Sequence, residues 1–301
     1  MDERDFINWI RRQPAIKAEQ VAVGPGDDCA VLHVDRELML VTTDQCADGV
    51  HFVLAQSGAR AAGYKVMARN LSDIAAMAGL PMAAVATVML PRGLAEADVQ
   101  EIYLGLRQAA DAFNCPLVGG DVGSWDGRLM LTVTMLGRPA VGKPVLRSGA
   151  RVGDVVCVTG SLGGSIASGK HLSFTPRVRE AAELVGRVEV HAMIDISDGL
   201  STDLGHLCRE SGVGAEIRAK ALPLSPTASQ AADPVAAALE DGEDYELLFA
   251  LAAEHAKALV AEQPLGVPVT HIGRIVKGPG MTLRVGRASR PLEARGYLHR
   301  V

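Results

Sequence analysis

Asp195-Ile196-Ser197-Asp198-Gly199-Leu200 places two carboxylates three residues apart, at a turn between a short apolar run and a helix. A single aspartate at a helix start is most often an N-cap, which is worth about 1 kcal/mol. Four other stretches repeat the arrangement, with aspartate where an apolar segment ends or a helix begins: Gly26-Asp27-Asp28, Thr42-Thr43-Asp44, Leu71-Ser72-Asp73 and Gly119-Gly120-Asp121. This recurrence predicts that the aspartates meet in space and hold metal ions against a polyphosphate.

The oxygen chemistry of these stretches indicates which metal to expect. Two like charges about 4 Å apart repel by about 4 kcal/mol at an effective dielectric constant of roughly 20, so a fold that gathers carboxylates needs cations. Carboxylate oxygens favour Mg²⁺ or Ca²⁺ over zinc, and Mg²⁺ usually bridges a few carboxylates to substrate phosphates. Thr42 and Thr43 beside Asp44 add oxygens of the same kind. Asp195 and Asp198, taken alone, remain balanced between helix cap and metal ligand.

Composition excludes some classes of partner. The 301 residues are 48% hydrophobic and 22% charged, which is typical of a globular protein with a sizeable core. The net charge is −5 and aromatic residues make up 4% of the chain. Both values argue against a nucleic-acid surface, which needs positive charge and stacking side chains. An acidic protein can still bind anionic substrates when divalent metals supply the positive charge.

The cysteines and the hydropathy of the chain indicate the cellular compartment in which we expect the protein. The five cysteines are widely spaced and none forms a Cys-x-x-Cys pair, so we expect reduced thiols and a cytoplasmic location: Cys29, Cys46, Cys115, Cys157 and Cys208. The first residues do not resemble a signal peptide. The segment 74–90 is uncharged, but Gly79-Leu80-Pro81 interrupts it. We therefore expect a helix end followed by a buried strand there, and no membrane partner.

Hydrophobic periodicity predicts a sheet with helices on one face in the first half of the chain. Strands are expected at 29–34, 38–43, 84–90, 116–118 and 129–136, and helices at 1–20, 59–79 and 96–113. The last helix is the clearest, because Val99, Ile102, Leu106 and Phe113 recur at helical spacing.

The segment 138–153 is the expected domain boundary, because it combines prolines, glycines and cations with little periodicity. Beyond it, strands at 155–159, 192–196, 215–217, 245–251 and 269–276 alternate with helices at 178–187, 198–211, 228–239 and 254–261. We therefore expect a chain of the α/β (α+β) class, divided into domains at 1–138 and 139–301.

Several features have a plain structural interpretation beside a functional one. Gly160-Ser161-Leu162-Gly163-Gly164 follows a strand, as a phosphate loop does, but the P-loop and dinucleotide fingerprints are absent, so a tight turn is an equal alternative. His51 alone is more often a turn residue than a ligand. The acidic turn Glu243-Asp244-Tyr245-Glu246 is more often a solvated loop. Arg147 could pair with phosphates or solvate a linker.

Eight stretches, taken together, resemble the thiamine-monophosphate kinase family, which belongs to the aminoimidazole ribonucleotide synthetase superfamily. They are GPGDDCAVL (24–32), TTDQCADGVHF (42–52), KVMARNLSDIAAMAG (65–79), GGD (119–121), RSGARVGDVVCVTGSLG (147–163), IDISDGLSTDLGHL (194–207), GVGAEI (212–217) and GEDYELLF (242–249). They span nearly the whole chain. GVHF, NLSDIAAM, ISDGL and GEDYEL together point to the kinase branch over its relatives.

The resemblance implies a fold, a reaction and partners. The fold would join an N-terminal ferredoxin-like domain, which binds ATP and metal and forms a homodimer through its sheet, to a C-terminal α/β domain that completes the active-site cleft. The reaction would be ATP-dependent phosphorylation of thiamine monophosphate to thiamine diphosphate, by direct in-line transfer with several Mg²⁺ ions. We assign no catalytic acid, base or nucleophile, because a phosphate monoester is already largely ionised at pH 7, its second pKa being about 6.

The resemblance also implies three groups of site residues. The metal positions are Asp28, Thr42, Thr43, Asp44, Asp73, Asp121, Asp195 and Asp198. The ATP contacts are Tyr103, Gly120, Asp121, Arg147 and Ser197. The thiamine-phosphate contacts are His51 and Glu243.

This chain departs from the family pattern at three places. The family usually reads GGDTT where residues 119–124 read GGDVGS, and the segment between Gly164 and Pro176 is shorter than usual. A position that can carry an aromatic contact to thiamine in relatives is Ala294 here, with Tyr297 close by. Two alternatives therefore stay open: a superfamily enzyme that uses ATP to activate an amide-type oxygen, and a nucleotide-binding paralogue without turnover.

Overall fold

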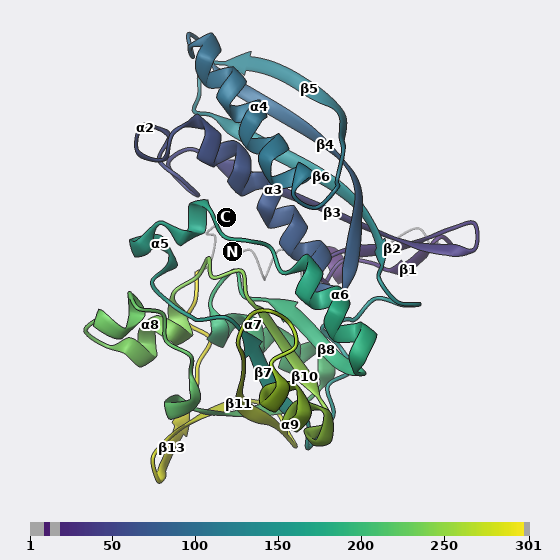
Figure 1. The fold of residues 1–301 in the computed structure, drawn as a ribbon, viewed down its shortest axis with the longest axis vertical. Helices are drawn as coiled ribbons and strands as arrows, with labels where there is room; N and C mark the ends of the chain where they lie inside the picture. The colour runs from purple at the N-terminus through teal and green to yellow at the C-terminus, as the bar shows by residue number, and fades with distance from the viewer. Residues whose placement is uncertain (1–8, 13–18, 298–301) are drawn as a thin grey trace.

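The computed structural model describes residues 9–12 and 19–297 and arranges them as two mixed sheets with helices packed against them (Figure 1). The mixed α/β class expected from the sequence is confirmed. The helix expected over residues 1–20 lies largely outside the described residues, although 9–12 are helical. In the described part of the chain, no helix is both long and apolar enough to cross a bilayer.

The N-terminal sheet has the strand order β1-β2-β3-β6-β4-β5. Its strands are β1 (Val21–Val23), β2 (Ala30–Val34), β3 (Glu37–Ala47), β4 (Gly79–Pro91), β5 (Leu117–Trp125) and β6 (Met130–Pro139). Neighbours run antiparallel except β4 and β5, which are parallel. The helices are α2 (Leu54–Ser57), α3 (Ala59–Ala76) and α4 (Glu96–Asp111), and α3 and α4 lie on one face of the sheet (Figure 1).

The helix α3 lies at the centre of this half, and even its lysine Lys65 is buried. It crosses α4 closely: a Cβ on Gly63 would lie 2.1 Å from the carbonyl oxygen of Ile102, and one on Gly105 would lie 2.0 Å from that of Arg60. Any side chain at these two glycines would push the helices apart. The crossing therefore fixes the direction in which α3 presents its polar residues.

The C-terminal sheet has the strand order β13-β12-β9-β11-β7-β10-β8. Its strands are β7 (Val155–Thr159), β8 (Val190–Asp195), β9 (Gly214–Arg218), β10 (Leu247–Leu251), β11 (Val269–Val276), β12 (Met281–Val285) and β13 (Ala288–Pro291). Only β12 and β9 pair in parallel among these strands. The helices and helical turns are α5 (Ser165–Ser168), η1 (Lys170–Leu172), α6 (Val178–Arg187), α7 (Leu200–Ser211), η2 (Ala219–Ala221), η3 (Ala228–Gln230), α8 (Pro234–Glu240) and α9 (Ala253–Glu262).

The strand β7, which lies between β11 and β10, is buried on both faces, and its side chains alternate between two apolar clusters. Val156 and Val158 face the cluster beneath α7 and α8. Val155 and Cys157 face the other side, towards α6 and α9. That second cluster continues without a break into the core of the N-terminal sheet.

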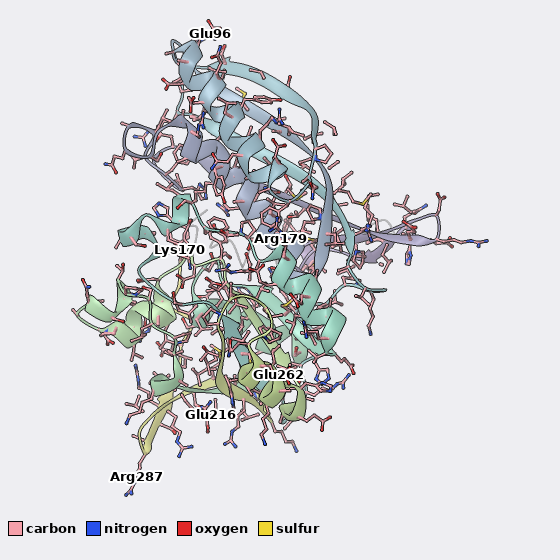
Figure 2. The ribbon with its side chains drawn as sticks, viewed as in Figure 1. Glu96, Lys170, Arg179, Glu216, Glu262 and Arg287 are labelled. Atoms are coloured by element: carbon pink, nitrogen blue, oxygen red, sulfur yellow. The ribbon has the colours of Figure 1, made fainter. Side chains whose placement is uncertain are left out.

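The helix α6 joins the two halves, because it packs on both α3 and β4. Arg179 on this helix lies at the junction (Figure 2). Its Nη2 donates to the carbonyl oxygen of Ala112 (2.8 Å), and its guanidinium lies over the ring of Phe113 at 5.5 Å. The two sheets are thus fixed against each other by packing, and the site described below lies between them.

Two expected elements differ from the structure. The strand expected at 116–118 extends through Gly119-Gly120-Asp121 to Trp125, because these residues pair with β4 along its length. The helix expected at 228–239 is split into η3 and α8, because Pro234 begins a new helix that Asp233 caps. The expected change from helix to buried strand near Gly79 is confirmed, since α3 ends at Ala76 and β4 begins at Gly79.

Candidate active site

Three carboxylates from distant parts of the chain gather between the sheets. Asp28 lies in the turn before β2, Asp73 in the last turn of α3, and Asp195 at the end of β8. Each offers an oxygen that lies within 4.8 Å of the others. The N-terminal half therefore supplies two of these groups and the C-terminal half one.

Burial and mutual repulsion make these carboxylates hard to ionise together. Burial, with the nearby Asp28 charge, raises the pKa of Asp195 to about 7. Burial, with the charges of Asp44, Asp195 and Asp28, raises the pKa of Asp73 well above its ordinary value. The opposing contribution comes from two hydroxyls: Ser72 Oγ donates to Asp195 at 2.6 Å, and Thr42 Oγ1 donates to Asp73 at 2.5 Å. The cluster thus calls for a counter-charge, which protons or cations can supply.

Arg147 supplies part of this charge. Its guanidinium holds the Asp28 carboxylate through two hydrogen bonds, Nε to Oδ2 at 3.0 Å and Nη2 to Oδ1 at 2.9 Å. Its backbone N–H donates to Asp27. Burial and the Asp28 charge raise the pKa of Asp27 to about 6. The resemblance does not include Asp27 among its site residues.

The strand β3 presents its three expected metal residues on two faces, as a strand must. Thr42 and Asp44 face α3, where Arg69 Nε donates to Asp44 Oδ2 at 2.9 Å. The hydroxyl of Thr43 instead contacts Thr134 Oγ1 at 3.0 Å, in the neighbouring strand β6. The structure therefore brings Thr42 and Asp44 towards Asp73, whereas the Thr43 side chain points away.

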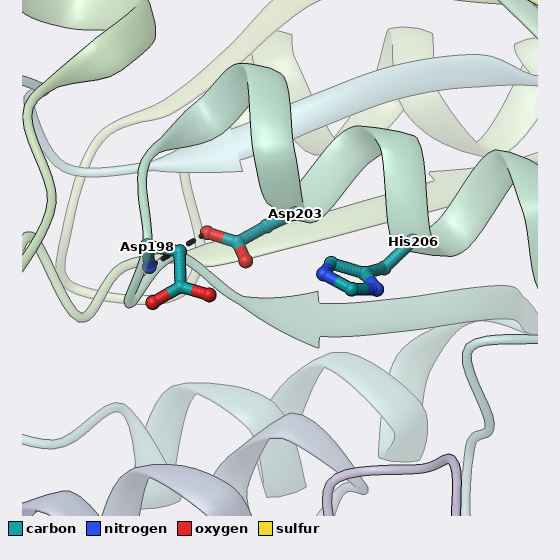
Figure 3. A group of neighbouring side chains, drawn as sticks. All are labelled: Asp198, Asp203 and His206. Atoms are coloured by element: carbon teal, nitrogen blue, oxygen red, sulfur yellow. Dashed lines mark hydrogen bonds between the residues drawn. The ribbon is translucent and has the colours of Figure 1, made fainter. Parts of the chain in front are cut away.

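The turn 195–200 is held by Asp203, which is not among the site residues that the resemblance implies. Asp203 Oδ2 accepts hydrogen bonds from the backbone N–H groups of Asp198 and Gly199, both at 3.1 Å. Figure 3 shows the Asp203 carboxylate beside Asp198, with His206 further along α7. Asp198, Asp203 and His206 form a second group with ligand atoms within 4.8 Å of one another. Since Arg209 Nη2 lies 3.0 Å from His206 Nδ1, a positive charge already faces this ring.

A cleft of about 980 Å³ opens beside the carboxylates, lined by residues from both halves. His51 and Glu243, the expected thiamine-phosphate contacts, lie on it, as do Ser197 and Asp198. The backbone N–H of Ala47 donates to His51 Nδ1 at 3.1 Å, which leaves the proton of a neutral imidazole on Nε2. Glu243 is tied to the turn, because its N–H donates to the carbonyl oxygen of Ser197 at 2.7 Å.

Tyr297, and not Ala294, lies at one end of this cleft. Tyr297 lines the cleft, and its N–H donates to the carbonyl oxygen of Asp198 at 2.9 Å. Ala294 instead lies against α7, 3.8 Å from where a Cβ on Gly205 would be. The aromatic ring at this end of the cleft is therefore that of Tyr297.

Three expected nucleotide residues line a separate cavity. Tyr103, Gly120 and Asp121 surround about 470 Å³ between α4 and β5, where the other lining residues are mostly apolar. Asp121 belongs to neither close group of metal-ligating side chains in the described part of the chain. The structure thus separates Asp121 from Asp28, Asp73 and Asp195.

The glycine-rich turn 160–164 behaves as a structural turn. The N–H of Gly163 donates to Asp244 Oδ2 and that of Gly164 to Asp241 Oδ2, both at 2.8 Å. Burial raises the pKa of Asp244 to about 7. These two amides are therefore already bonded to carboxylates, which favours the tight-turn interpretation over a phosphate loop.

Sequence reasoning missed two cations, Lys65 and Arg69, which also line the cleft. They lie one turn apart on α3, and Ser72 and Asp73 continue the same face. The signal was present in the sequence: these are the only two cations in an otherwise uncharged stretch between Tyr64 and Ser72. A pair of lysine and arginine at helical spacing before NLSD could have been predicted to face the site.

Comparison with known proteins gives a consistent result. Residues 26–138 match the family described as "AIR synthase related protein, N-terminal domain", and residues 151–286 match "AIR synthase related protein, C-terminal domain". A thiamine-monophosphate kinase of Rhodopirellula baltica is 39% identical over 311 residues, covering 99% of this chain and 97% of that protein. A thiamine-monophosphate kinase of Bacillus subtilis is 32% identical, covering 99% of both chains.

Among solved structures, "AaThiL complexed with AMPPCP and TMP" superimposes with a TM-score of 0.83 at 29% identity, covering 99% of this chain and 97% of that one. Its similarity extends across both sheets.

Proposed function

The chain belongs to the thiamine-monophosphate kinase family, and we propose that it performs that family's reaction. It transfers the γ-phosphoryl group of ATP to thiamine monophosphate and releases thiamine diphosphate and ADP. One observation carries the proposal: carboxylates from both halves, those of Asp28, Asp73 and Asp195, come within reach of one cation. Ser197 and Asp198, which follow Asp195 in the same turn, line the cleft. The relative solved with AMPPCP and TMP gives it further support.

The metal would be Mg²⁺, because the donors at the cluster are all oxygens. Asp28, Asp73 and Asp195 would hold it. Of the other expected ligands, Thr42 and Asp44 lie towards Asp73, and Asp198 lies in the turn after Asp195. The Thr43 side chain points away and Asp121 lines the separate cavity, so these two suit the metal less well. When bound, Mg²⁺ neutralises charge on the transferred phosphoryl group. A cation also offsets the burial and the repulsion that together raise the pKa values of Asp73 and Asp195.

The nucleotide would extend between the apolar cavity and the cleft. The cavity lined by Tyr103, Gly120 and Asp121 suits a purine, which needs apolar contact and a few polar groups. Arg147 and Ser197 would contact the phosphates. The Val122-Gly123-Ser124 departure lies in β5, so its effect falls on the nucleotide and not on the acceptor.

The acceptor would occupy the larger cleft, with His51 and Glu243 as its contacts. Thiamine carries a permanent positive charge on its thiazolium ring, and the carboxylates that line the cleft suit that charge: Asp198, Glu240, Asp241 and Glu243. An oxygen of the acceptor phosphate then attacks the γ-phosphorus, the bond to the β-phosphate oxygen breaks, and ADP leaves. Alignment and charge neutralisation account for the rate, so no general base is assigned.

Each of the two sheets would belong to a domain with its own role. Residues 1–138 would bind ATP and metal and form a homodimer through the N-terminal sheet, and residues 139–301 would complete the cleft. The outer face of the sheet supports the dimer, because Met82, Val85 and Met89 of β4 expose between 38% and 43% of their surface. The five free, buried cysteines suit a cytoplasmic enzyme.

The decisive experiment incubates the purified protein with ATP, MgCl₂ and thiamine monophosphate and measures thiamine diphosphate by chromatography. We expect stoichiometric thiamine diphosphate and ADP, and none when EDTA replaces MgCl₂. ATP binding without product would contradict the proposal and favour a paralogue without turnover.

Asp198→Asn tests the role of the turn in the same assay. Loss of a metal-binding carboxylate should lower kcat by about 100-fold or more. Asp233→Asn is the matched control, because Asp233 also lies at a helix start and accepts bonds from Val235 and Ala236 N–H, but on α8. Activity near that of the wild type in Asp198→Asn would mean that Asp198 serves only the helix start.

A further inference from the structure

Lys65 carries a fully buried side chain at the edge of the cleft. Its Nζ donates to the carbonyl oxygen of His51 at 2.7 Å and forms an ion pair with Glu243 Oε2. An ammonium has three N–H donors and is costly to bury without partners. Burial lowers the pKa of Lys65, and the Glu243 charge opposes that effect. The lysine is thus held at this position by two partners.

These partners come from the two halves of the chain. His51 lies in the loop between β3 and α2, and Glu243 lies in the loop before β10. Both loops line the cleft. One ammonium on α3 therefore connects the two groups that are expected to contact the acceptor.

The Glu243 loop needs such an anchor. Glu243 and Tyr245 both adopt left-handed backbone conformations, with φ of 68° and 49°, which residues other than glycine seldom adopt. The N–H groups of Glu243 and Tyr245 bond to Ser197 and Ile196 carbonyl oxygens at 2.7 and 2.8 Å, which holds the backbone. Only 18% of the Glu243 side chain is exposed, and Lys65 fixes where its carboxylate lies. Strained backbone that is held by several contacts is typical of binding sites.

We propose that Lys65 is a positioning residue for thiamine monophosphate, which fixes the Glu243 carboxylate and the His51 loop in the geometry that binds the acceptor. This inference rests on the proposed function and adds a residue to it. Lys65 acts through its two partners, so it sets the affinity for the acceptor and not the rate of phosphoryl transfer. Interactions of this kind appear in KM and leave kcat nearly unchanged.

The test replaces Lys65 with methionine, which keeps the length of the side chain and removes the charge. We expect Lys65→Met to raise the KM and the calorimetric Kd for thiamine monophosphate about 10-fold, with kcat and the KM for ATP within about 3-fold of wild type. Arg60→Met is the matched control, because Arg60 lies on the same helix and pairs with Glu101, but on the surface. Arg60→Met should leave kcat, the KM for ATP, and both the KM and the Kd for thiamine monophosphate unchanged.

A double-mutant cycle with Glu243→Gln separates positioning from general stabilisation. If Lys65 acts through Glu243, Lys65→Met should raise the Kd for thiamine monophosphate by a smaller factor in the Glu243→Gln background than in the wild type. Unchanged acceptor affinity in Lys65→Met, or an equal loss of affinity for ATP, overturns the inference. Should Lys65→Met not fold, Lys65→Arg takes its place: it should raise the Kd for thiamine monophosphate alone, and an unchanged Kd overturns the role.

The same measurements distinguish a protein that lacks the proposed kinase activity from one in which Lys65 has no positioning role. Wild-type protein that binds thiamine monophosphate without making thiamine diphosphate contradicts the kinase reaction, whereas the Kd comparison between wild type and Lys65→Met still decides the role of Lys65. Wild-type protein that does not bind thiamine monophosphate contradicts both.

Discussion

At the scale of single residues, the site brings carboxylates close together and compensates them with hydrogen-bond donors. These carboxylates are those of Asp28, Asp73 and Asp195. Their oxygens gather within 4.8 Å, so each ionised group disfavours ionisation of the next. Ser72 and Thr42 donate hydrogen bonds that favour the ionised forms, and Arg147 pairs with Asp28. Because proton binding at Asp195 differs between the folded and unfolded states, it can be measured through the pH dependence of stability.

We predict that Asp195 makes the protein less stable as pH rises. Its pKa of about 7 in the folded state exceeds the ordinary value of 3.8, so between these pH values the folded state binds more protons than the unfolded state. The free energy of unfolding therefore falls from about pH 4 to about pH 7. Asp195→Asn should flatten this fall, as measured by urea unfolding at several pH values without divalent ions.

The control for this measurement is Asp126→Asn. Asp126 pairs with Arg92 at the surface, where 87% of its side chain is exposed, so its removal should leave the pH dependence as it is in the wild type. An Asp195→Asn variant with the wild-type pH dependence would contradict the assignment.

At the scale of elements, the strand β5 is the clearest case of tertiary pairing that overrides a local signal. Gly119-Gly120-Asp121 has the composition of a turn, yet it continues a strand that pairs in parallel with β4. Gly120 lies so close to β4 that a Cβ would meet the carbonyl oxygen of Ala86 at 1.8 Å. The absence of a side chain thus permits this strand pairing and shapes the wall of the apolar cavity.

Gly120→Ala should separate β5 from β4 and weaken nucleotide binding. A forced methyl group in a packed region costs about 1–3 kcal/mol, so we expect a lower melting temperature and a KM for ATP raised several-fold. Gly119→Ala is the control, since a Cβ there would meet only Val85 Cγ1 at 3.9 Å. If Gly120→Ala and Gly119→Ala have the same melting temperature and the same KM for ATP, the close approach of Gly120 to β4 affects neither stability nor nucleotide binding.

The sequence was sufficient for features that depend on neighbouring residues. Periodicity gave the helix α4, and the Gly79-Leu80-Pro81 break gave the start of β4. The recurrence of aspartates at the ends of predicted elements also pointed to the cluster of Asp28, Asp73 and Asp195, although the pair Asp195 and Asp198 alone fits a helix cap equally well. Local patterns could not show that Lys65 would meet Glu243, 178 residues away, or that Arg69 would pair with Asp44. Such contacts depend on how the halves pack, which no local pattern encodes.

At the scale of the whole molecule, the outer face of the N-terminal sheet is an apolar surface that a second copy could cover. Val85 and Met89 point outward from β4 and expose 40% and 38% of their surface. Trp125 at the end of β5 exposes 38%. Apolar side chains that gather on one face of a sheet are typical of an interface between subunits.

We predict that Val85→Glu shifts the protein from the proposed homodimer to a monomer, as measured by light scattering after size exclusion. A charge in the centre of an apolar interface must be desolvated without a partner, which costs several kcal/mol and weakens the dimer. Val285→Glu is the control, because Val285 is 50% exposed on β12 in the C-terminal sheet. A wild-type protein that is monomeric at micromolar concentration would refute the dimer directly.

The apolar cluster that passes from the N-terminal sheet through α6 to β7 and β10 has a consequence for how the molecule unfolds. Hydrogen bonding divides the chain into two sheets, but the burial of apolar surface does not follow that division. Neither half encloses this cluster by itself, so melting one sheet exposes the core of the other. We therefore expect the molecule to unfold as a single cooperative unit, and the two walls of its cleft to keep their relative position for as long as the whole molecule stays folded.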